Sequence, residues 1–330
     1  MTDAVLVTGA TGFIGSYLVR ELVASGTPVR VLVRQADQLE PAIRSRVEVV
    51  QGDLRDPTVP GTAVPGVRTV YHLAAYCRTW DKQRSLFTDI NVHAVERLLE
   101  ASRRSGVERF VHVSTNLTIP SGPPLPPDAP LPLSTPYSET KRAGERLVES
   151  YAASGGGAVI VHPTRVYGPG PLTDANALTK IISQYIRGRF RFRLADGDVL
   201  ANYVHVADVT AGMRLAADRG RTGAHYLLGG QDLSFRDFLR QVAEISGVYH
   251  RVVALPRSAA IAVGYAAILI GQFGGRVLIT PDWVKSLLVE WGADSGPARR
   301  DLGYAPRPIR ERIAETISWI RGDTPSPVAA

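Results

Sequence analysis

The chain has 330 residues, 45% of them hydrophobic, which is enough for one large or two modest domains with a real core. Its single cysteine, Cys77, excludes a disulfide framework and a cysteine-rich metal site, and the seven histidines are scattered, so we predict no metal. The formal charge of +7 is not carried by one long basic block, and we predict no nucleic-acid partner.

The first strand runs directly into a glycine-rich turn. Val5 to Val7 is a short apolar run, Gly9, Gly12 and Gly15 follow it, and apolar residues recur at helical spacing from Ser16 to Ala24. This order places unpaired N–H groups and the positive end of a helix dipole where a diphosphate binds. A bare tight turn is the alternative, because the spacing differs from G-x-G-x-x-G.

The next two predicted strands end in charged residues. Val29 to Val33 is followed by Arg34, at the position that faces the adenosine ribose in a dinucleotide fold, where an arginine favours a 2′-phosphate. Val47 to Val50 leads to Asp53, which suits an adenine amino group. An ordinary solvated arginine and a turn aspartate are the alternatives.

A fourth strand, 69–75, ends in small residues that permit close approach of a flat ligand. The helix predicted over 89–105 holds Asn91 in its first turn, where it supports the site or caps the helix. A fifth strand, 109–113, leads to Thr115. The stretch from Pro120 to Pro136 holds eight prolines and is predicted to be a surface excursion.

Tyr137 and Lys141 are four residues apart, on one face of a helix predicted from just after Tyr137 to about Ala153. A nearby ammonium and the positive nicotinamide would lower the tyrosine pKa from its ordinary value near 10. The phenol could then exchange a proton with an alcohol or a carbonyl at neutral pH. A tyrosine and a lysine at this spacing also occur often by chance, so the surrounding elements must decide whether the pair is functional.

A sixth strand, 158–162, completes an alternation of strands and helices from residue 4 to about 163. This pattern predicts an α/β fold with a doubly wound parallel sheet of the Rossmann type. Ligands bind beyond the carboxyl ends of such strands, where the glycine turn, Arg34, Asp53 and Thr115 all fall. That coincidence favours the dinucleotide interpretation of the turn.

Beyond residue 170 the alternation weakens. Arginine and phenylalanine alternate over 187–193, which predicts a strand with its arginines on one face, solvated or near an anionic ligand. Short strands are predicted at 202–206 and 226–228, and helices at 207–218, 235–246 and 310–320. The apolar stretch 259–271 is shorter than the roughly 20 residues of a membrane-spanning helix. We expect a buried or partly exposed helix there, and peripheral membrane contact stays open.

The chain resembles the extended short-chain dehydrogenase/reductase family of the NAD-dependent epimerase/dehydratase type. The matching stretches are Thr8–Gly15, Gly52–Leu54, Tyr71–Ala75, Tyr137 with Lys141, Pro163–Gly170, Tyr203–Val209 and Leu302–Tyr304. Within the family, the second strand and the apolar 259–271 stretch look most like 3β-hydroxysteroid dehydrogenase-like and dihydroflavonol reductase-like members.

The resemblance implies a dinucleotide-binding domain over 1–166, with 203–230 returning to it, and a smaller C-terminal substrate domain over 167–323. The tail, 324–330, is predicted to be disordered. The resemblance also implies a homodimer that pairs the helices near 89–105 and 138–153. Because the chain enters its first strand at once, we expect no signal peptide and a cytoplasmic location.

The resemblance implies roles for individual residues. Tyr137 would be the acid/base, Lys141 would tune it, and Thr115 would orient the reacting oxygen. The cofactor-binding candidates are Gly9, Thr11, Gly12, Phe13, Ile14, Gly15, Arg34, Asp53, Leu54, Leu73, Ala74, Ala75, Asn91, Val113, Tyr137, Lys141, Pro163 and Val166. The candidates for the substrate pocket are Tyr76, Thr115, Arg165 and Tyr167.

Three functions remain in view. The leading hypothesis is an NADP(H)-dependent oxidoreductase, with NAD as the alternative cofactor, that interconverts a ketone and a secondary alcohol on a bulky, largely apolar small molecule. The second is an NAD-dependent sugar-nucleotide epimerase, and the third is a non-catalytic dinucleotide sensor. A 4,6-dehydratase is set aside because Asn116 and Leu117 follow Thr115 where such enzymes carry Asp and Glu.

Overall fold

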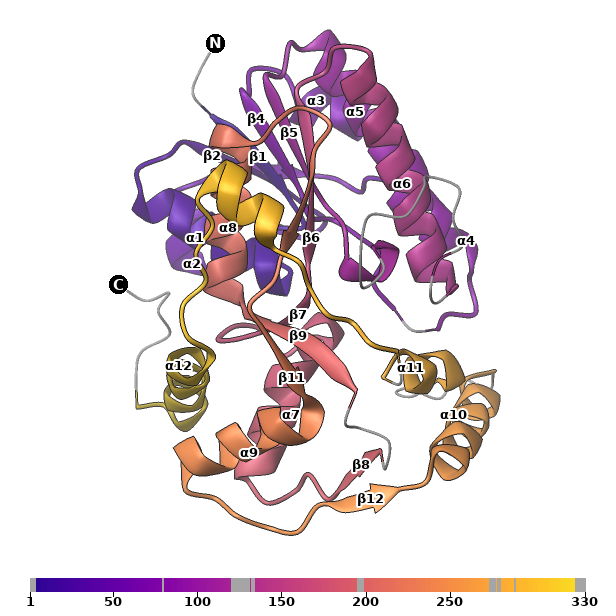
Figure 1. Ribbon diagram of the computed structural model, residues 1–330. Coiled ribbons are helices and arrows are strands. Elements are labelled where there is room, and N and C mark those ends of the chain that lie inside the picture. The colour runs from indigo at the N-terminus through magenta and orange to yellow at the C-terminus, as the bar shows by residue number, and fades with distance from the viewer. Residues whose placement is uncertain are drawn as a thin grey trace.

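The computed structural model describes residues 4–78, 80–119, 131, 134–194, 199–272, 277, 280–287 and 289–323. Most of the proline-rich stretch and the whole 324–330 tail lie outside these residues. Within them, the larger half of the molecule is built on a seven-stranded parallel sheet, and the smaller half carries short sheets and helices beneath it (Figure 1).

The strand order of the large sheet is β10-β6-β5-β4-β1-β2-β3, and every neighbouring pair is parallel. The strands are β1 Val5–Thr8, β2 Val29–Val33, β3 Glu48–Gln51, β4 Thr69–His72, β5 Arg109–Val113, β6 Ala158–Pro163 and β10 His225–Leu228. The order reverses between β1 and β4, so a crevice opens beyond the carboxyl ends of these two strands. The predicted doubly wound parallel sheet is confirmed.

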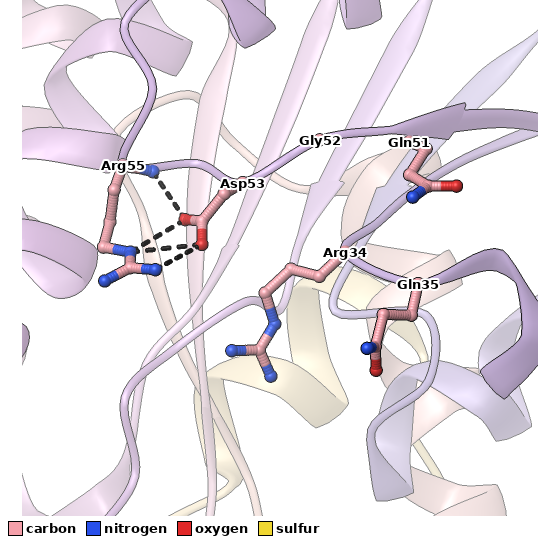
Figure 2. Close-up of a pocket in the computed structure, with 6 residues that line it drawn as sticks. All are labelled: Arg34, Gln35, Gln51, Gly52, Asp53 and Arg55. Carbon is pink, nitrogen blue, oxygen red and sulfur yellow. Dashed lines mark hydrogen bonds and ion pairs between the residues drawn. The ribbon is translucent and has the colours of Figure 1, made fainter.

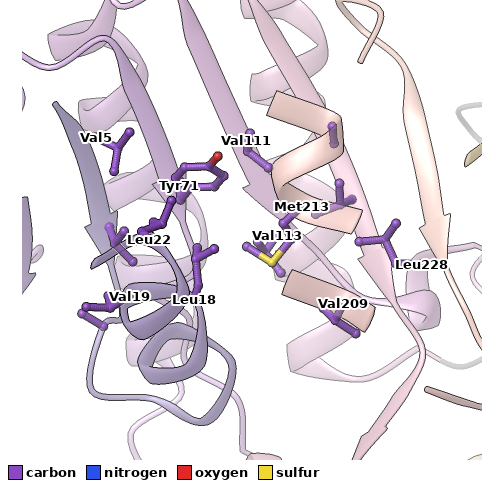
Figure 3. Close-up of a cluster of buried hydrophobic side chains, with 14 of the residues drawn as sticks. Val5, Leu18, Val19, Leu22, Tyr71, Val111, Val113, Val209, Met213 and Leu228 are labelled. Atoms are coloured by element: carbon purple, nitrogen blue, oxygen red, sulfur yellow. The ribbon is translucent and has the colours of Figure 1, made fainter. Parts of the chain in front are cut away.

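Helices cover both faces of this sheet (Figure 1). One face packs against α1 (Phe13–Ala24) and α8 (Val206–Arg219). In that layer Leu18, Leu22 and Met213 meet Val111 and Val113 of β5 (Figure 3). The other face packs against α3 (Val59–Ala63), α5 (Ala94–Arg104) and α6 (Pro136–Ala153). Burial on both faces explains why apolar residues dominate the central strands β1 and β6.

The helix predicted over 89–105 is interrupted. It consists of α4 (Ser85–Thr88), a π-helical turn over Asp89–His93 and α5. The π turn buries Asn91 beneath α6, and a Cβ on Gly144 of α6 would lie only 2.6 Å from the Asn91 carbonyl oxygen. The two helices therefore approach each other closely at this point.

Helix α6 begins at Pro136, before Tyr137 rather than after it. Thr135 and Ser138 form a reciprocal capping box, in which the Ser138 N–H donates to Thr135 Oγ1 over 3.1 Å and the Thr135 N–H donates to Ser138 Oγ over 2.9 Å. Proline fits the first helical position because no partner is needed there for an N–H. The cap thus fixes Tyr137 in the first turn.

The smaller half has a three-stranded sheet of order β11-β9-β7 and a two-stranded sheet of β12 and β8. Its strands are β7 Arg165–Tyr167, β8 Phe192–Leu194, β9 Leu200–His205, β11 Gln231–Ser234 and β12 Val253–Leu255. Its helices are α7 Ala177–Ile186, α9 Phe235–Ser246, α10 Arg257–Gln272, α11 Pro281–Ser286 and α12 Ile309–Arg321. Since β10 pairs with β6 and α8 packs on the large sheet, the chain crosses between the halves more than once. The division at residue 166 stays a prediction.

The strand predicted over 187–193 is wrong for most of its length, because only Phe192–Leu194 forms β8. Gly188 adopts a φ of +66°, and the N–H groups of Arg189 and Phe190 donate to the carbonyl of Gln184. The stretch therefore ends α7, a position where a left-handed glycine is common. No helix in the described ranges is long and apolar enough to cross a bilayer.

Candidate active site

The turn between β1 and α1 is shaped by glycine. Gly9 has a φ of +71°, and a Cβ on it would lie 2.8 Å from the Ala74 nitrogen. A Cβ on Gly15 would lie 2.1 Å from the Gly9 carbonyl oxygen. Gly12 is the N-cap of α1 and has no side chain to satisfy the first N–H groups of the helix. These donors and the closely approachable backbone fit the diphosphate of a dinucleotide.

A cavity of about 1050 Å³ runs from this turn along the crevice into the smaller half. Most of the predicted site residues line it: Gly9, Thr11, Gly12, Phe13, Ile14, Gly15, Arg34, Asp53, Leu54, Leu73, Ala74, Ala75, Tyr76, Val113, Thr115, Tyr137, Pro163, Arg165 and Val166. The predicted site residues at the ends of six separate strands, and in the turns that follow them, thus line one cavity.

Three predicted site residues do not line the cavity. Asn91 is buried and braces the wall, since its side-chain oxygen accepts from the Tyr76 N–H over 2.8 Å and its amide donates to Thr140. Lys141 is buried behind the wall, and its Nζ donates to the Val113 carbonyl over 2.8 Å. Tyr167 is a core residue of the smaller half, with its ring edge-on to Phe238.

The end of the crevice beyond β2 and β3 is rich in positive charge. Arg34, Asp53 and Arg55 line a connected hollow of about 550 Å³ (Figure 2). Arg55 holds the Asp53 carboxylate through its own backbone N–H and a guanidinium contact of 2.7 Å, and this pairing lowers the pKa of Asp53. The Arg34 guanidinium extends into the space beside this pair (Figure 2). Two arginines against one carboxylate suit an additional phosphate.

The middle of the cavity holds Tyr137, Thr115 and Cys77. Burial raises the pKa of Tyr137 well above its usual value and the Cys77 thiol adds to the rise, while a hydrogen bond with Thr115 lowers it. The Tyr137 phenol is therefore protonated at neutral pH in the protein alone. Burial also lowers the pKa of Lys141 to about 8. A phenol and a hydroxyl that share one wall can both hold a substrate oxygen.

A buried polar network supports Thr115 from behind. The Thr115 carbonyl accepts from His162 Nδ1 over 3.0 Å, and His162 Nε2 lies 3.0 Å from His225 Nδ1. His225 in turn reaches Glu149 over 3.2 Å. Because a carbonyl only accepts, Nδ1 of His162 carries the hydrogen and Nε2 is free to accept from His225.

Glu145 joins the same network. Its carboxylate accepts from the hydroxyls of Ser114 and Thr118 and pairs with Arg142 over 3.1 Å. The ligand atoms of Glu145, His162 and His225 lie within 4.8 Å of one another, although these residues are far apart in the sequence. Direct hydrogen bonds and the arginine account for this cluster without an ion, and the absence of a metal stays a prediction.

Three buried histidines, His72, His162 and His205, predict that the fold loses stability in acid. Burial lowers the pKa of His162 to about 4 and of His72 and His205 to about 3, so below pH 6.5 the unfolded chain binds protons that the folded chain does not. As far as these histidines are concerned, the free energy of unfolding should be level well above pH 6.5 and fall as the pH drops below it. His162 alone would account for about 3 kcal/mol at pH 4. Urea unfolding at pH 7 and pH 4.5 measures the loss.

His162→Asn keeps a donor toward the Thr115 carbonyl but does not titrate, so it should shrink the difference between the two pH values. His93→Asn, at an exposed histidine, is the matched control and should leave the difference unchanged. Equal pH dependence in His162→Asn and the parent protein would contradict the assignment.

The far end of the cavity is apolar. Its wall is formed by α7, α10 and α11 with β8 and β12, together with Leu287, which follows α11. The apolar residues of these elements in the wall include Leu178, Ile181, Phe192, Leu194, Leu255, Ala260, Val263, Trp283 and Val284. Among the described lining residues that these five elements contribute, only Arg193 carries a formal charge. The wall suits a ligand with a large apolar surface.

Several site residues escape sequence reasoning. Arg55 stands two residues after Asp53, and that proximity was the available signal. Cys77, Glu145 and His162 carry no motif that marks them. Cys77 follows β4 and meets Tyr137 where α6 packs beside the sheet, and the packing of α6 against β6 brings Glu145 to His162 behind Thr115. The aromatic and aliphatic wall comes from the part of the chain with the weakest pattern.

A doubly wound parallel sheet, a glycine turn at its switch point and a Tyr–Lys helix beside the crevice define an enzyme that uses a nicotinamide dinucleotide. The family model described as NAD dependent epimerase/dehydratase family matches residues 5–229. The chain belongs to this family, which is of the extended short-chain dehydrogenase/reductase type.

The proteins similar to this chain include both steroid and sugar-nucleotide enzymes. The chain is 30% identical to "Sterol demethylase protein B" of Methylococcus capsulatus, over 96% of this chain and 98% of that protein. It is 30% identical to "3 beta-hydroxysteroid dehydrogenase/Delta 5-->4-isomerase" of Mycobacterium tuberculosis, over 92% of this chain and 86% of that protein. The solved structure "MoeE5 in complex with UDP-glucuronic acid and NAD" matches with a TM-score of 0.76 and 30% identity, over 97% of this chain and 100% of that one. The resemblance to 3β-hydroxysteroid dehydrogenase-like members is confirmed.

Proposed function

We propose that this protein is an NADP(H)-dependent oxidoreductase that interconverts a ketone and a secondary alcohol on a bulky, largely apolar small molecule. The observation that carries the proposal is that the cavity has three chemically different parts. Two arginines stand at one end, Tyr137 and Thr115 lie in the middle, and an apolar wall closes the other end. The sterol and steroid names of two relatives support the apolar substrate.

Tyr137, Thr115 and Lys141 each have a role in this chemistry. NADP(H), when bound, supplies or accepts the hydride. The protonated Tyr137 phenol donates a proton to the carbonyl oxygen during reduction and takes it back during oxidation. The Thr115 hydroxyl holds the same oxygen and stabilises its developing negative charge. Lys141, fixed on the Val113 carbonyl, places a positive charge behind the phenol.

A sugar-nucleotide epimerase is the second candidate. It is favoured by Arg165 and Arg193, which line the cavity and could face a diphosphate, and by the UDP-glucuronic acid with which MoeE5 forms its complex. The two candidates differ in how they treat the cofactor. An epimerase recycles it in place, whereas a reductase must release it after each turnover.

The test begins with the purified protein before any cofactor is added. The protein is denatured and the released dinucleotide is identified by mass. An empty protein that then binds NADPH and reduces a panel of apolar ketones supports the proposal. Stoichiometric NAD or NADH, with turnover of a UDP-sugar in the absence of added cofactor, contradicts it.

Arg34→Ser should shift the cofactor preference. We expect the Kd for NADPH to rise about tenfold or more, because a charge-assisted hydrogen bond to a phosphate is worth roughly 1.5–3 kcal/mol. The Kd for NADH should change less than about threefold, since NADH lacks the 2′-phosphate. Fluorescence titration of both dinucleotides measures the ratio, and Arg44→Ser on the exposed surface is the control. An unchanged NADPH to NADH ratio would show that Arg34 does not hold the phosphate.

A further inference from the structure

Helix α10 is apolar around most of its surface and yet is largely exposed. Over Arg257–Gln272 the buried residues are Ala260, Gly264 and Gly271, whereas Leu269 and Ile270 are each 60% exposed and Tyr265 is 58% exposed. Its inner side packs tightly on α11, since a Cβ on Gly264 would lie 2.8 Å from the Pro281 nitrogen. One side of the helix is thus anchored to the protein, and the other presents large apolar side chains.

The neighbouring strands extend this apolar face. Strand β12 ends at Leu255, two residues before α10 begins, and pairs with β8 so that Val253 stands opposite Phe192. Both of these side chains are exposed. The three elements lie together at one end of the smaller half (Figure 1). We call the exposed apolar residues Phe192, Val253, Val263, Tyr265, Leu269 and Ile270 the apolar end.

The charged residues in the segments that carry the apolar end are all arginines. Residues 187–194 and 249–272 hold six arginines and no aspartate or glutamate. Five of these arginines are exposed, at positions 187, 189, 191, 251 and 257. A surface of this kind is complementary to a partner that offers negative charge around an apolar interior, as a bilayer with anionic headgroups does. A second copy of the chain would bring arginines against arginines, which disfavours self-association through this face.

The apolar end is also continuous with the cavity. Phe192, Leu255 and Val263 line the cavity, and Phe192 and Val263 are exposed on the outside as well. An apolar molecule leaving a bilayer at this face would therefore meet an apolar cavity wall without first crossing water.

We propose that the apolar end docks on an anionic phospholipid surface, with α10 lying in the interface and the flanking arginines against the headgroups. The docking rests on this surface alone. The further step, delivery of a membrane-dissolved substrate into the cavity, rests on the proposed function.

Vesicle flotation with the full chain tests the docking. Vesicles of phosphatidylcholine with phosphatidylglycerol should carry the protein at low salt, and vesicles of phosphatidylcholine alone should carry at least tenfold less. The double variant Leu269→Ser with Ile270→Ser should bind the anionic vesicles at least tenfold more weakly. The matched control, Leu269→Met with Ile270→Met, keeps the apolar surface and should bind as the parent does. Both positions are exposed, so the fold should tolerate either pair.

The charge is tested separately by Arg251→Glu with Arg257→Glu, which should weaken binding to anionic vesicles at least tenfold, whereas Arg44→Glu should not. No flotation with anionic vesicles, or equal binding by all variants, would overturn the proposal. A dimer that sediments as such and becomes a monomer in the serine variant would also overturn it and assign the face to a second copy. NADPH binding and ketone reduction are measured in detergent-free solution on the same samples. Their failure with normal flotation would remove the proposed function and leave the docking intact.

Discussion

Replacing Tyr137 with phenylalanine is expected to lower kcat for ketone reduction by a factor of about 10²–10⁴, because the site loses its proton donor. The Kd for NADPH should change less than about threefold, since the phenylalanine ring keeps most of the contact area and removes one hydroxyl. Steady-state kinetics with an apolar ketone and a separate titration with NADPH measure the two quantities.

Tyr151→Phe is the matched control, because it makes the same change on the same helix, at a residue packed beneath Arg103 and away from the cavity. It should leave kcat unchanged. A Tyr137→Phe variant with the parent kcat would remove Tyr137 from the chemistry.

The direction of the Tyr137 pKa shift also predicts the pH profile. Burial holds the pKa well above its usual value, so in reduction the phenol is already in its donating form at neutral pH. Reduction should therefore be level through neutral pH as far as this group is concerned, and oxidation should accelerate as the pH rises toward the phenol pKa. The profile of Tyr137→Phe should lack this rise.

Replacing Gly15 with alanine is expected to disrupt both the turn and the cofactor site. The new methyl would lie 2.1 Å from the Gly9 carbonyl oxygen, and neither the strand nor the helix can move without opening the core beneath them. Overpacking of this kind costs roughly 1–3 kcal/mol, and the displaced helix N-terminus should weaken NADPH binding by about tenfold or more. Urea unfolding and NADPH titration measure the two effects.

Gly61→Ala is the control for the same substitution, because α3 leaves open space around that position. It should be neutral or slightly stabilising, since alanine is the better helix former. A Gly15→Ala protein with parent stability and parent Kd would show that the turn does not approach the diphosphate as described.

The large sheet could be predicted from the sequence because each of its strands is a local signal. Strands buried on both faces are rich in apolar residues, and the segments predicted at 29–33 and 109–113 match β2 and β5 residue for residue. The glycine turn was readable because only glycine fits its angles and contacts. The positions of Arg34, Asp53 and Thr115 at strand ends then placed them on one edge of the sheet.

The role of a residue could not be predicted from the sequence where it depends on partners distant in the chain. Tyr167 resembles a site residue in its motif, but β7 turns its ring into the core of the smaller half against Phe238. The arginine and phenylalanine alternation at 187–193 has the period of a strand, but the left-handed Gly188 commits it to ending α7. In both cases a tertiary contact outweighs a local pattern.

The sequence by itself determined the doubly wound sheet and the family and predicted Tyr137 and Lys141 as a catalytic pair, because periodicity and motif chemistry are properties of neighbouring residues. Only the tertiary structure decided how the cavity is walled. It placed Arg34 and Arg55 around one hollow, set the Glu145–His162–His225 network behind Thr115, and left the apolar side of α10 exposed beside the cavity. Each of these features depends on segments that are distant in the sequence, and their burial and charge follow from packing that no local pattern encodes.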